Sequence, residues 1–385
     1  MAFSHEAVKC AGHDAGVRRI SVVVAAVMLA AACSSGSGSD DEAGADEDTP
    51  APVAPEEVDP APSAGCAGAQ DVPAGSSEQT IGFGGDTWRY FQAVPERDDP
   101  GEAAPLLLSL HGYLSPAEIQ AGIAEFEAIA ATEGFVTVTP QAIGEPYPYW
   151  SLSPEGRDDV AFVEALLDQV EADLCVDRNR IFATGYSGGA MLSSLLACRL
   201  ADRVAAIGPV AGVSDFDGCE PSRPVPVLAF HGTEDPDIPF DGTEPTQVPP
   251  FSPESEQSFS SRLEGSVPDL LATWAARNGC GPGPVEETVS DEVTLFTYEE
   301  CDADTALYAI EGGGHTWPGS EFSGLLGDLL GPTTTDISAS ELMWDFFRGP
   351  PPPAQRWFWR LKRTPERALQ PPEGKGHTLL VPVPG

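Results

Sequence analysis

Ser187 lies in a pattern that is typical of a nucleophilic serine. Glycines surround it in the sequence Gly-Tyr-Ser-Gly-Gly at residues 185–189, apolar residues precede it from Ile181, and a helix-like stretch follows at residues 191–197. This order predicts a tight strand-to-helix turn, with glycines where side chains would not fit. Such a serine would transfer acyl groups through a covalent ester. The alternative is an ordinary core turn, since the motif alone is weak in a chain with 40 glycines.

A serine hydroxyl needs a base to take its proton, and three histidines lie in the central part of the chain. His111, His231 and His315 each follow an apolar, strand-like run. His315 comes after three glycines beyond the last run, where we expect the base. His231 is given no catalytic role, because a buried structural histidine is the commoner case. No two histidines have chelating spacing, so we expect no metal and no organic cofactor.

Asp235 is the carboxylate that we expect to orient His315. It follows another strand-like run, and Glu234 and Asp237 on the same loop are its rivals. The resulting chain order of Ser187, Asp235 and His315 is the order found in α/β-hydrolases. The sequence therefore predicts a catalytic triad whose three members follow three different strands.

The developing oxyanion requires two backbone N–H donors. We expect one from Gly188, directly after the serine, and the other from Tyr113, which follows the apolar run at residues 106–110. Aromatic residues cluster around the same loops. We expect Trp150, Tyr186 and Trp317 to line a substrate cleft, with core packing as the alternative.

Apolar strand-like runs alternate with helix-like periodicity between residues 66 and 349. The expected strands are residues 87–94, at the sheet edge, 106–110, 135–138, 181–186, 204–207, 225–230 and 307–310. The expected helices are residues 117–133, 159–174, 191–197, 267–276 and 339–347. This alternation predicts an α/β fold with a mostly parallel central sheet and helices on both faces. Ligand sites in such sheets lie at the carboxyl ends of the strands.

The ends of the chain differ from this central domain. Residues 1–33 resemble a signal peptide with a lipobox, in which cleavage would leave a lipid on Cys33; simple secretion is the alternative. Residues 34–65 are an acidic linker rich in Pro, Ala, Gly and Ser, which we expect to be disordered. Residues 350–385 form a Pro-rich tail with six basic and two acidic residues, expected to be disordered rather than a membrane contact. We therefore expect an extracellular or cell-surface protein, attached to a membrane only through its lipid.

The formal net charge of −40 excludes a nucleic-acid partner, which requires clustered Lys and Arg. The charge also favours a soluble monomer. Beyond Cys10 and Cys33 of the leader, six cysteines remain, an even number that indicates three disulfides in an exported chain. Proximity along the chain favours Cys198–Cys219 and Cys280–Cys301, which leaves Cys66–Cys175.

Six segments together resemble the secreted polyhydroxybutyrate depolymerase and feruloyl or acetylxylan esterase family of α/β-hydrolases. They are residues 110–113, 158–163, 185–189, 231–235, 274–280 and 312–319. The resemblance covers residues 79–347 and implies an α/β-hydrolase fold, the triad named above and a serine esterase. Three functions follow as hypotheses: an esterase on hydroxyalkanoate oligomers, an esterase on feruloyl or acetyl groups of polysaccharide, and a catalytically inactive binding lipoprotein. The substrate would be an ester in the first two.

Overall fold

The computed structural model describes residues 59–144, 147–153, 156–243 and 265–349. All of them fall within one compact unit. The expected signal peptide with Cys33, most of the linker and the basic tail lie outside the described residues, so those expectations stay predictions. No helix in the described ranges is long and apolar enough to cross a membrane.

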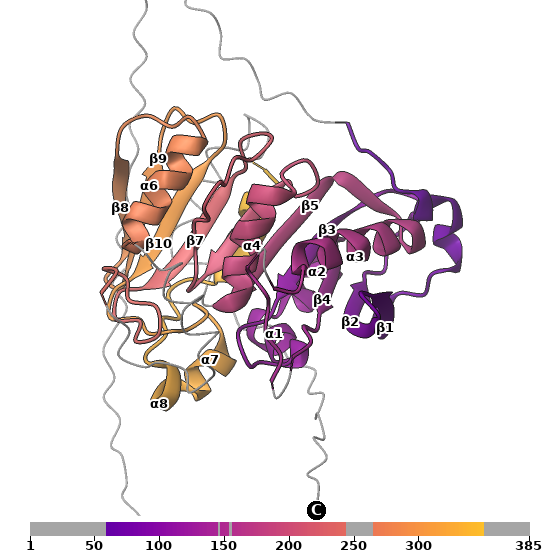
Figure 1. The fold of residues 1–385 in the computed structure, drawn as a ribbon, viewed down its shortest axis with the longest axis horizontal. Helices are drawn as coiled ribbons and strands as arrows, with labels where there is room; N and C mark the ends of the chain where they lie inside the picture. Colours follow the sequence, from indigo (N-terminus) through magenta and orange to yellow (C-terminus); the bar gives the residue numbers. More distant parts are fainter. Residues whose placement is uncertain (1–58, 145–146, 154–155, 244–264, 350–385) are drawn as a thin grey trace, which may run out of the picture. The chain divides into compact units, whose positions relative to one another are not determined.

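A ten-stranded sheet forms the centre of the fold (Figure 1). In spatial order its strands are β1 (Gly75–Phe83), β2 (Asp86–Val94), β4 (Val136–Pro140), β3 (Ala104–Leu110), β5 (Val176–Tyr186), β6 (Ala206–Val210), β7 (Val227–Gly232), β10 (Thr305–Ile310), β9 (Val293–Tyr298) and β8 (Pro284–Ser290). The six strands from β4 to β10 pair in parallel, and antiparallel pairs flank them. The expected mostly parallel sheet is confirmed. The carboxyl ends of these six strands share one edge of the sheet.

Helices cover both faces of the sheet, as expected. They are α1 (Ala117–Ala124), α2 (Phe126–Glu133), α3 (Asp159–Asp173), α4 (Gly188–Arg199), α6 (Val267–Arg277), α7 (Glu321–Leu325), α8 (Gly327–Leu330) and α9 (Ala339–Phe347), with the 3-10 helix η1 (Ala64–Asp71) at the start. Apolar residues of α3, α4 and α6 join one core cluster, whereas those of α1, α2 and α9 join a second cluster. The two clusters correspond to the two faces of the sheet.

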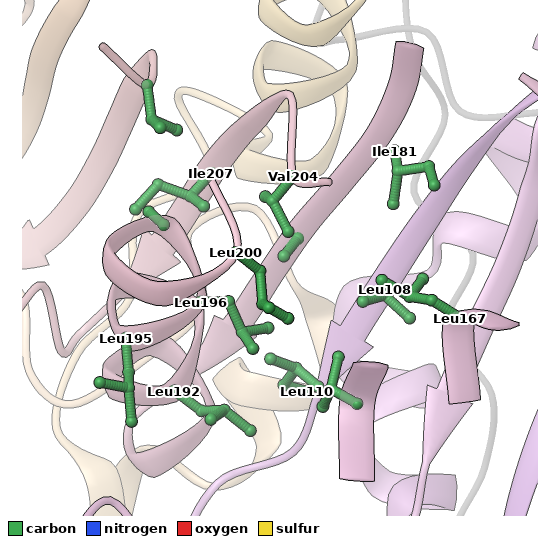
Figure 2. Packing of buried hydrophobic residues seen from close by; sticks show 14 of the residues in the cluster. Leu108, Leu110, Leu167, Ile181, Leu192, Leu195, Leu196, Leu200, Val204 and Ile207 are labelled. Carbon is green, nitrogen blue, oxygen red and sulfur yellow. The ribbon is translucent and has the colours of Figure 1, made fainter. Parts of the chain in front are cut away.

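The apolar run of β3 explains why this strand is central. All seven of its residues are buried. Leu106, Leu108 and Leu110 contact the first cluster, and Leu107 contacts the second, since successive side chains point to opposite faces. Figure 2 shows Leu192 and Leu196 of α4 beside Leu110. Burial of one such leucine stabilises the fold by about 1.5–3 kcal/mol.

Two structural expectations are wrong, and one strand pair was not predicted. The helix expected over residues 117–133 is two helices, because Glu125 adopts a left-handed φ of 51° that ends α1. Strand β2 was expected at the edge of the sheet, but β1 pairs on its outer side. The antiparallel pair β8 and β9 was not expected, since its residues lack a continuous apolar run and β8 is largely exposed.

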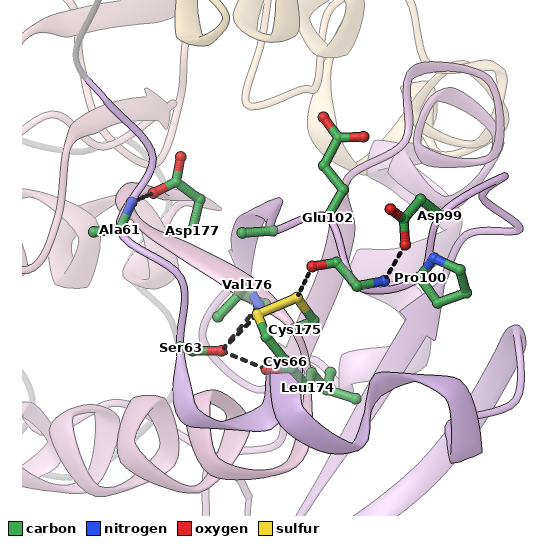
Figure 3. Close-up of a disulfide and its surroundings, with 12 residues drawn as sticks. Ala61, Ser63, Cys66, Asp99, Pro100, Glu102, Leu174, Cys175, Val176 and Asp177 are labelled. Carbon is green, nitrogen blue, oxygen red and sulfur yellow. Dashed lines mark hydrogen bonds between the residues drawn. A yellow bond between two sulfur atoms is a disulfide. The ribbon is translucent and has the colours of Figure 1, made fainter.

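The three expected disulfides are confirmed: Cys66–Cys175, Cys198–Cys219 and Cys280–Cys301. Figure 3 shows that the chain next to Cys66 is bound to the start of β5. The Ser63 hydroxyl donates to Leu174 O at 2.6 Å and accepts from Val176 N at 3.0 Å, and Ala61 N donates to Asp177. The folded unit thus includes residues 61–63, expected to belong to the disordered linker, because their backbone groups pair with the first residues of β5.

Candidate active site

Ser187 occupies the turn between β5 and α4 in a strained backbone conformation. Its φ is 55° and its ψ is −118°, which costs a residue with a Cβ about 1–3 kcal/mol. A hydrogen bond from Ser187 N to Val210 O, 2.9 Å long, helps to hold this turn. A Cβ at Gly189 would collide with the carbonyl oxygens of Leu110 and His111, so only glycine fits there. These contacts establish the predicted strand–turn–helix geometry around the serine.

His315 and Asp235 meet on loops that follow β10 and β7. His315 Nδ1 lies 2.7 Å from Asp235 Oδ2, and both side chains are buried. The two loops are tied together by Glu234 N donating to Gly313 O at 2.9 Å and by Gly312 N donating to the Thr233 hydroxyl at 2.8 Å. Of the rival carboxylates on the β7 loop, Asp235 is therefore the one that binds Nδ1.

Four donors surround the Asp235 carboxylate. Oδ1 accepts hydrogen bonds from the backbone N–H groups of Asp237 and Ile238, at 2.9 and 2.8 Å. Oδ2 faces His315 Nδ1 and also His231 Nε2, which lies 3.3 Å away. Burial would raise the pKa of this carboxyl, but the two imidazoles outweigh it and hold the pKa well below its ordinary value. Asp235 is thus ionised and can fix the orientation of His315.

Tyr186 and Asp237 lie near His315 in addition to Asp235. The Tyr186 hydroxyl donates to His315 O, and the two rings lie 5.0 Å apart between centroids. Burial would lower the pKa of the imidazole, but the carboxylates of Asp235 and Asp237 raise it above its ordinary value. Asp237 Oδ2 lies 4.0 Å from Nε2, the nitrogen not used by Asp235. This second carboxylate was expected only as a rival of Asp235.

Ser187 and His315 are brought to the same edge of the sheet by Tyr186, which immediately precedes the serine and contacts His315. Within the described ranges, no hydrogen bond joins Ser187 Oγ to His315 Nε2. Hydrogen bonds between a nucleophile and its base are often long in a free enzyme and shorten when substrate binds. The structure thus pairs Asp235 with His315 and places Ser187 directly after a strand of the same parallel sheet.

Tyr113 and Gly188 border one space, as an oxyanion hole requires. A Cβ added to Gly188 would lie 3.3 Å from Tyr113 N. The backbone N–H groups of both residues lack a hydrogen-bond acceptor among the described residues. Gly112 allows this approach, because a Cβ there would lie 3.1 Å from the Tyr186 ring. Two free donors beside a strained serine suit the stabilisation of a tetrahedral oxyanion.

His111 braces the loop that carries Tyr113. Its Nε2 accepts a hydrogen bond from Ala142 N at 2.9 Å, so its proton lies on Nδ1, which donates to Gly112 O at 2.7 Å. Burial lowers the pKa of this imidazole to about 4. Trp150 Nε1 donates to His111 O at 2.8 Å. His111 is therefore a neutral structural group.

The expected cleft wall of Trp150 and Trp317 is wrong. The two residues are 6% and 1% exposed, and the indole N–H of Trp317 donates to the Ser340 hydroxyl at 3.0 Å. Tyr186 is also buried, against His315. Both tryptophans can be buried because each indole N–H has an acceptor within the protein, which removes the cost of burying that polar group. Tyr149 is 38% exposed instead, with its ring 6.3 Å from that of Tyr113.

His231 is a residue that the sequence reasoning left without a role at the site. It is 2% exposed, and its Nε2 lies 2.8 Å from Ile238 O as well as near Asp235. The four-residue separation of His231 and Asp235 in the sequence was the feature that could have predicted this contact.

In the described part of the chain, no group of three or more His, Cys, Asp or Glu is arranged to hold a metal ion.

No family model matches this chain. Among curated proteins, "Putative esterase NocK" of Nocardia uniformis subsp. tsuyamanensis is 28% identical over 86% of this chain and 98% of its own length. Feruloyl esterase B of Piromyces equi is 30% identical over 56% of the chain, and the bifunctional acetylxylan esterase/xylanase XynS20E of Neocallimastix patriciarum is 28% identical over 62%. The chain spans only 40% and 32% of these two longer proteins.

Among solved structures, an acetyl xylan esterase from Aspergillus awamori aligns with 62% of this chain and 94% of its own, at 14% identity and a TM-score of 0.47. The parallel strands, the helices on both faces and the Ser187 elbow between β5 and α4 are features of the α/β-hydrolase fold. The expected fold is confirmed, and the named relatives are esterases.

Proposed function

We propose that this chain is a serine carboxylic ester hydrolase with Ser187 as nucleophile, His315 as general base and acid, and Asp235 as the group that orients His315. The observation that carries the proposal is the 2.7 Å contact between His315 Nδ1 and Asp235, on the loops that follow two strands parallel to the one that ends at Ser187. The esterase names of the relatives support it.

In the first half of the reaction, Ser187 Oγ attacks the ester carbonyl carbon while its proton passes to His315 Nε2. The N–H groups of Gly188 and Tyr113 donate to the negative oxygen that forms. The bond from carbon to the alcohol oxygen then breaks, and the alcohol leaves with the proton from Nε2. Ser187 remains acylated. Asp235 stabilises the imidazolium and keeps Nε2 directed at the reacting atoms.

In the second half, water gives a proton to His315 Nε2 and its oxygen adds to the acyl carbon. The bond to Ser187 Oγ breaks, Oγ regains the proton, and the carboxylic acid is released. Each step uses only groups of this chain, water and the ester. The Ser187 side chain makes no capping hydrogen bond to its own helix, so its hydroxyl stays free to react.

For the substrate class we propose feruloyl or acetyl esters of polysaccharide. The relatives named feruloyl esterase B and acetylxylan esterase/xylanase support this choice, and the exposed ring of Tyr149 near Tyr113 suits contact with a sugar face or an aromatic acyl group. Hydroxyalkanoate oligomers, which the sequence resemblance also implies, are the competing substrate. Three disulfides support export to an oxidising compartment. Attachment through a lipid on Cys33 stays a prediction.

The proposal is tested with chromogenic acetate and butyrate esters, using wild type and Ser187→Ala. We expect wild type to hydrolyse them and the variant to be at least about 10⁴-fold slower, with unchanged circular dichroism. Equal background rates in both proteins would favour the inactive binding lipoprotein. Release of ferulate from feruloylated arabinoxylan, compared with release of 3-hydroxybutyrate from its oligomers, then distinguishes the two substrate classes.

A further inference from the structure

Asp237 is a charged side chain at the reacting nitrogen that the proposed mechanism does not use. Its Oδ2 lies 4.0 Å from His315 Nε2, and its side chain is 23% exposed. In the proposed mechanism the departing alcohol takes its proton from Nε2. Asp237 therefore lies beside the position of that alcohol. Asp235 already serves as the carboxylate that contacts Nδ1, so the presence of a second carboxylate near Nε2 needs another reason.

The position of Asp237 is set by the same contacts that hold the triad. Its own N–H donates to Asp235 Oδ1 at 2.9 Å, and Ile238 N donates to the same oxygen at 2.8 Å. Ile238 O in turn faces His231 Nε2 at 2.8 Å. The backbone on either side of Asp237 is therefore anchored to the triad's acid, and the carboxylate is directed toward Nε2 by a fixed turn.

The carboxylate of Asp237 has unused acceptor capacity. Among the described residues, no hydrogen bond to its oxygens is formed, and the only ion-pair contact is with His315 Nε2, at 4.0 Å. Burial and the neighbouring Asp235 raise its pKa, which the His315 imidazole opposes. A half-buried carboxylate that lacks hydrogen-bond donors gains most from a ligand that supplies one, because a hydrogen bond to a charged acceptor is stronger than one between neutral groups.

The alcohol half of the ester is the ligand part that reaches this carboxylate. During acylation its oxygen takes the proton from Nε2 and so lies about 3 Å from that nitrogen. A hydroxyl on the adjacent carbon, in a gauche arrangement, lies about 3 Å from the leaving oxygen. Asp237 Oδ2, at 4.0 Å from Nε2, is within reach of that second hydroxyl.

We propose that Asp237 is a specificity-determining residue that accepts a hydrogen bond from a hydroxyl adjacent to the esterified oxygen, so that the enzyme prefers esters of polyols and sugars to esters of simple alcohols. This inference rests on the proposed serine esterase function and narrows its substrate class. The same carboxylate repels an anionic group at this position. It therefore opposes alcohol halves that end in a carboxylate, as those of hydroxyalkanoate dimers do.

The test compares two acetate esters that differ in one group: 2-hydroxyethyl acetate, which has the adjacent hydroxyl, and propyl acetate, which has a methyl in its place. The measured quantity is the ratio of their kcat/KM values in wild type, Asp237→Ala and Asp237→Asn. We expect the ratio to fall about 10- to 100-fold in Asp237→Ala, as for loss of a hydrogen bond to a charged group. Asp237→Asn keeps a neutral acceptor of the same size and should fall between the other two.

Using a ratio separates recognition of the hydroxyl from the effect of Asp237 on His315, since a change in the imidazole acts on both esters alike. Glu234→Gln is the matched control, because it removes one negative charge from an exposed position of the same loop and should leave the ratio unchanged. An unchanged ratio in both Asp237 variants, or an equal loss on both esters, would overturn the inference while the esterase function stands. Hydrolysis of both esters by wild type no faster than by Ser187→Ala would instead refute the proposed function itself.

Discussion

Asp235→Asn tests the assignment of the triad's acid in the most direct way, because the substitution preserves size and removes only the charge and one acceptor. The wild-type carboxylate is surrounded by donors: two backbone N–H groups at Oδ1 and two imidazoles at Oδ2. An asparagine offers one acceptor and one NH₂ group in place of two acceptors. Whichever way the amide is turned, its NH₂ group faces a donor.

The structure indicates which orientation is favoured. If the NH₂ group takes the place of Oδ1, the backbone N–H groups of Asp237 and Ile238 lose their acceptor, which costs about 1–3 kcal/mol for a buried group such as that of Ile238. Turning NH₂ toward His315 lets the imidazole respond, since Nδ1 can accept when its proton moves to Nε2. The second orientation should therefore prevail. It places a proton on the nitrogen that must receive the proton of Ser187.

We expect this wrong tautomer to lower kcat by about 10³- to 10⁴-fold at neutral pH. The assay is steady-state hydrolysis of propyl acetate, together with thermal unfolding to show that the variant is folded. Asp237→Asn serves as the matched control on the same loop and should retain kcat within about tenfold on this ester. The reasoning is refuted if Asp235→Asn keeps kcat within tenfold of wild type, or if Asp237→Asn suffers the larger loss.

Two further predictions follow from the electrostatics and the cross-links. The midpoint of the acid limb of the kcat/KM–pH profile should lie above the ordinary imidazole pKa of 6.5, because His315 must be neutral to act as base and its pKa is raised. Asp237→Asn removes one of the carboxylates that raise the pKa of His315 and should move this midpoint to lower pH. A midpoint that does not move would contradict the effect of Asp237 on the pKa of His315. Loss of the Cys66–Cys175 disulfide, which closes 109 residues, should lower the free energy of unfolding by about 5 kcal/mol, against about 3 kcal/mol for Cys280–Cys301, which closes 21. Urea denaturation of the double Cys→Ser variants measures the difference, and a greater cost for the shorter loop would show that loop entropy does not dominate.

The sequence alone determined the features that depend on short stretches of chain. The turn around Ser187 could be predicted because only glycine fits the close backbone contact at position 189, so the turn requires glycine there. The central position of β3 could be predicted from its apolar run, because a strand that is buried on both faces is nearly continuously apolar. Parallel strands then bring their carboxyl ends to one side of the sheet, which is why Ser187, Asp235 and His315 could be expected on the same side from their positions after three strands.

Only the tertiary structure decided between groups that are neighbours in sequence. Asp235 and Asp237 are two residues apart on one loop, yet the first binds Nδ1 of an imidazole 80 residues away and the second lies near Nε2. Trp150 and Trp317 were predicted to line a cleft, but both are buried, and each donates its indole N–H to a hydrogen bond within the protein. The direction of a loop side chain depends on the donors and acceptors that other segments bring to it. Those contacts form only when the whole sheet assembles, so no local pattern of residues records them.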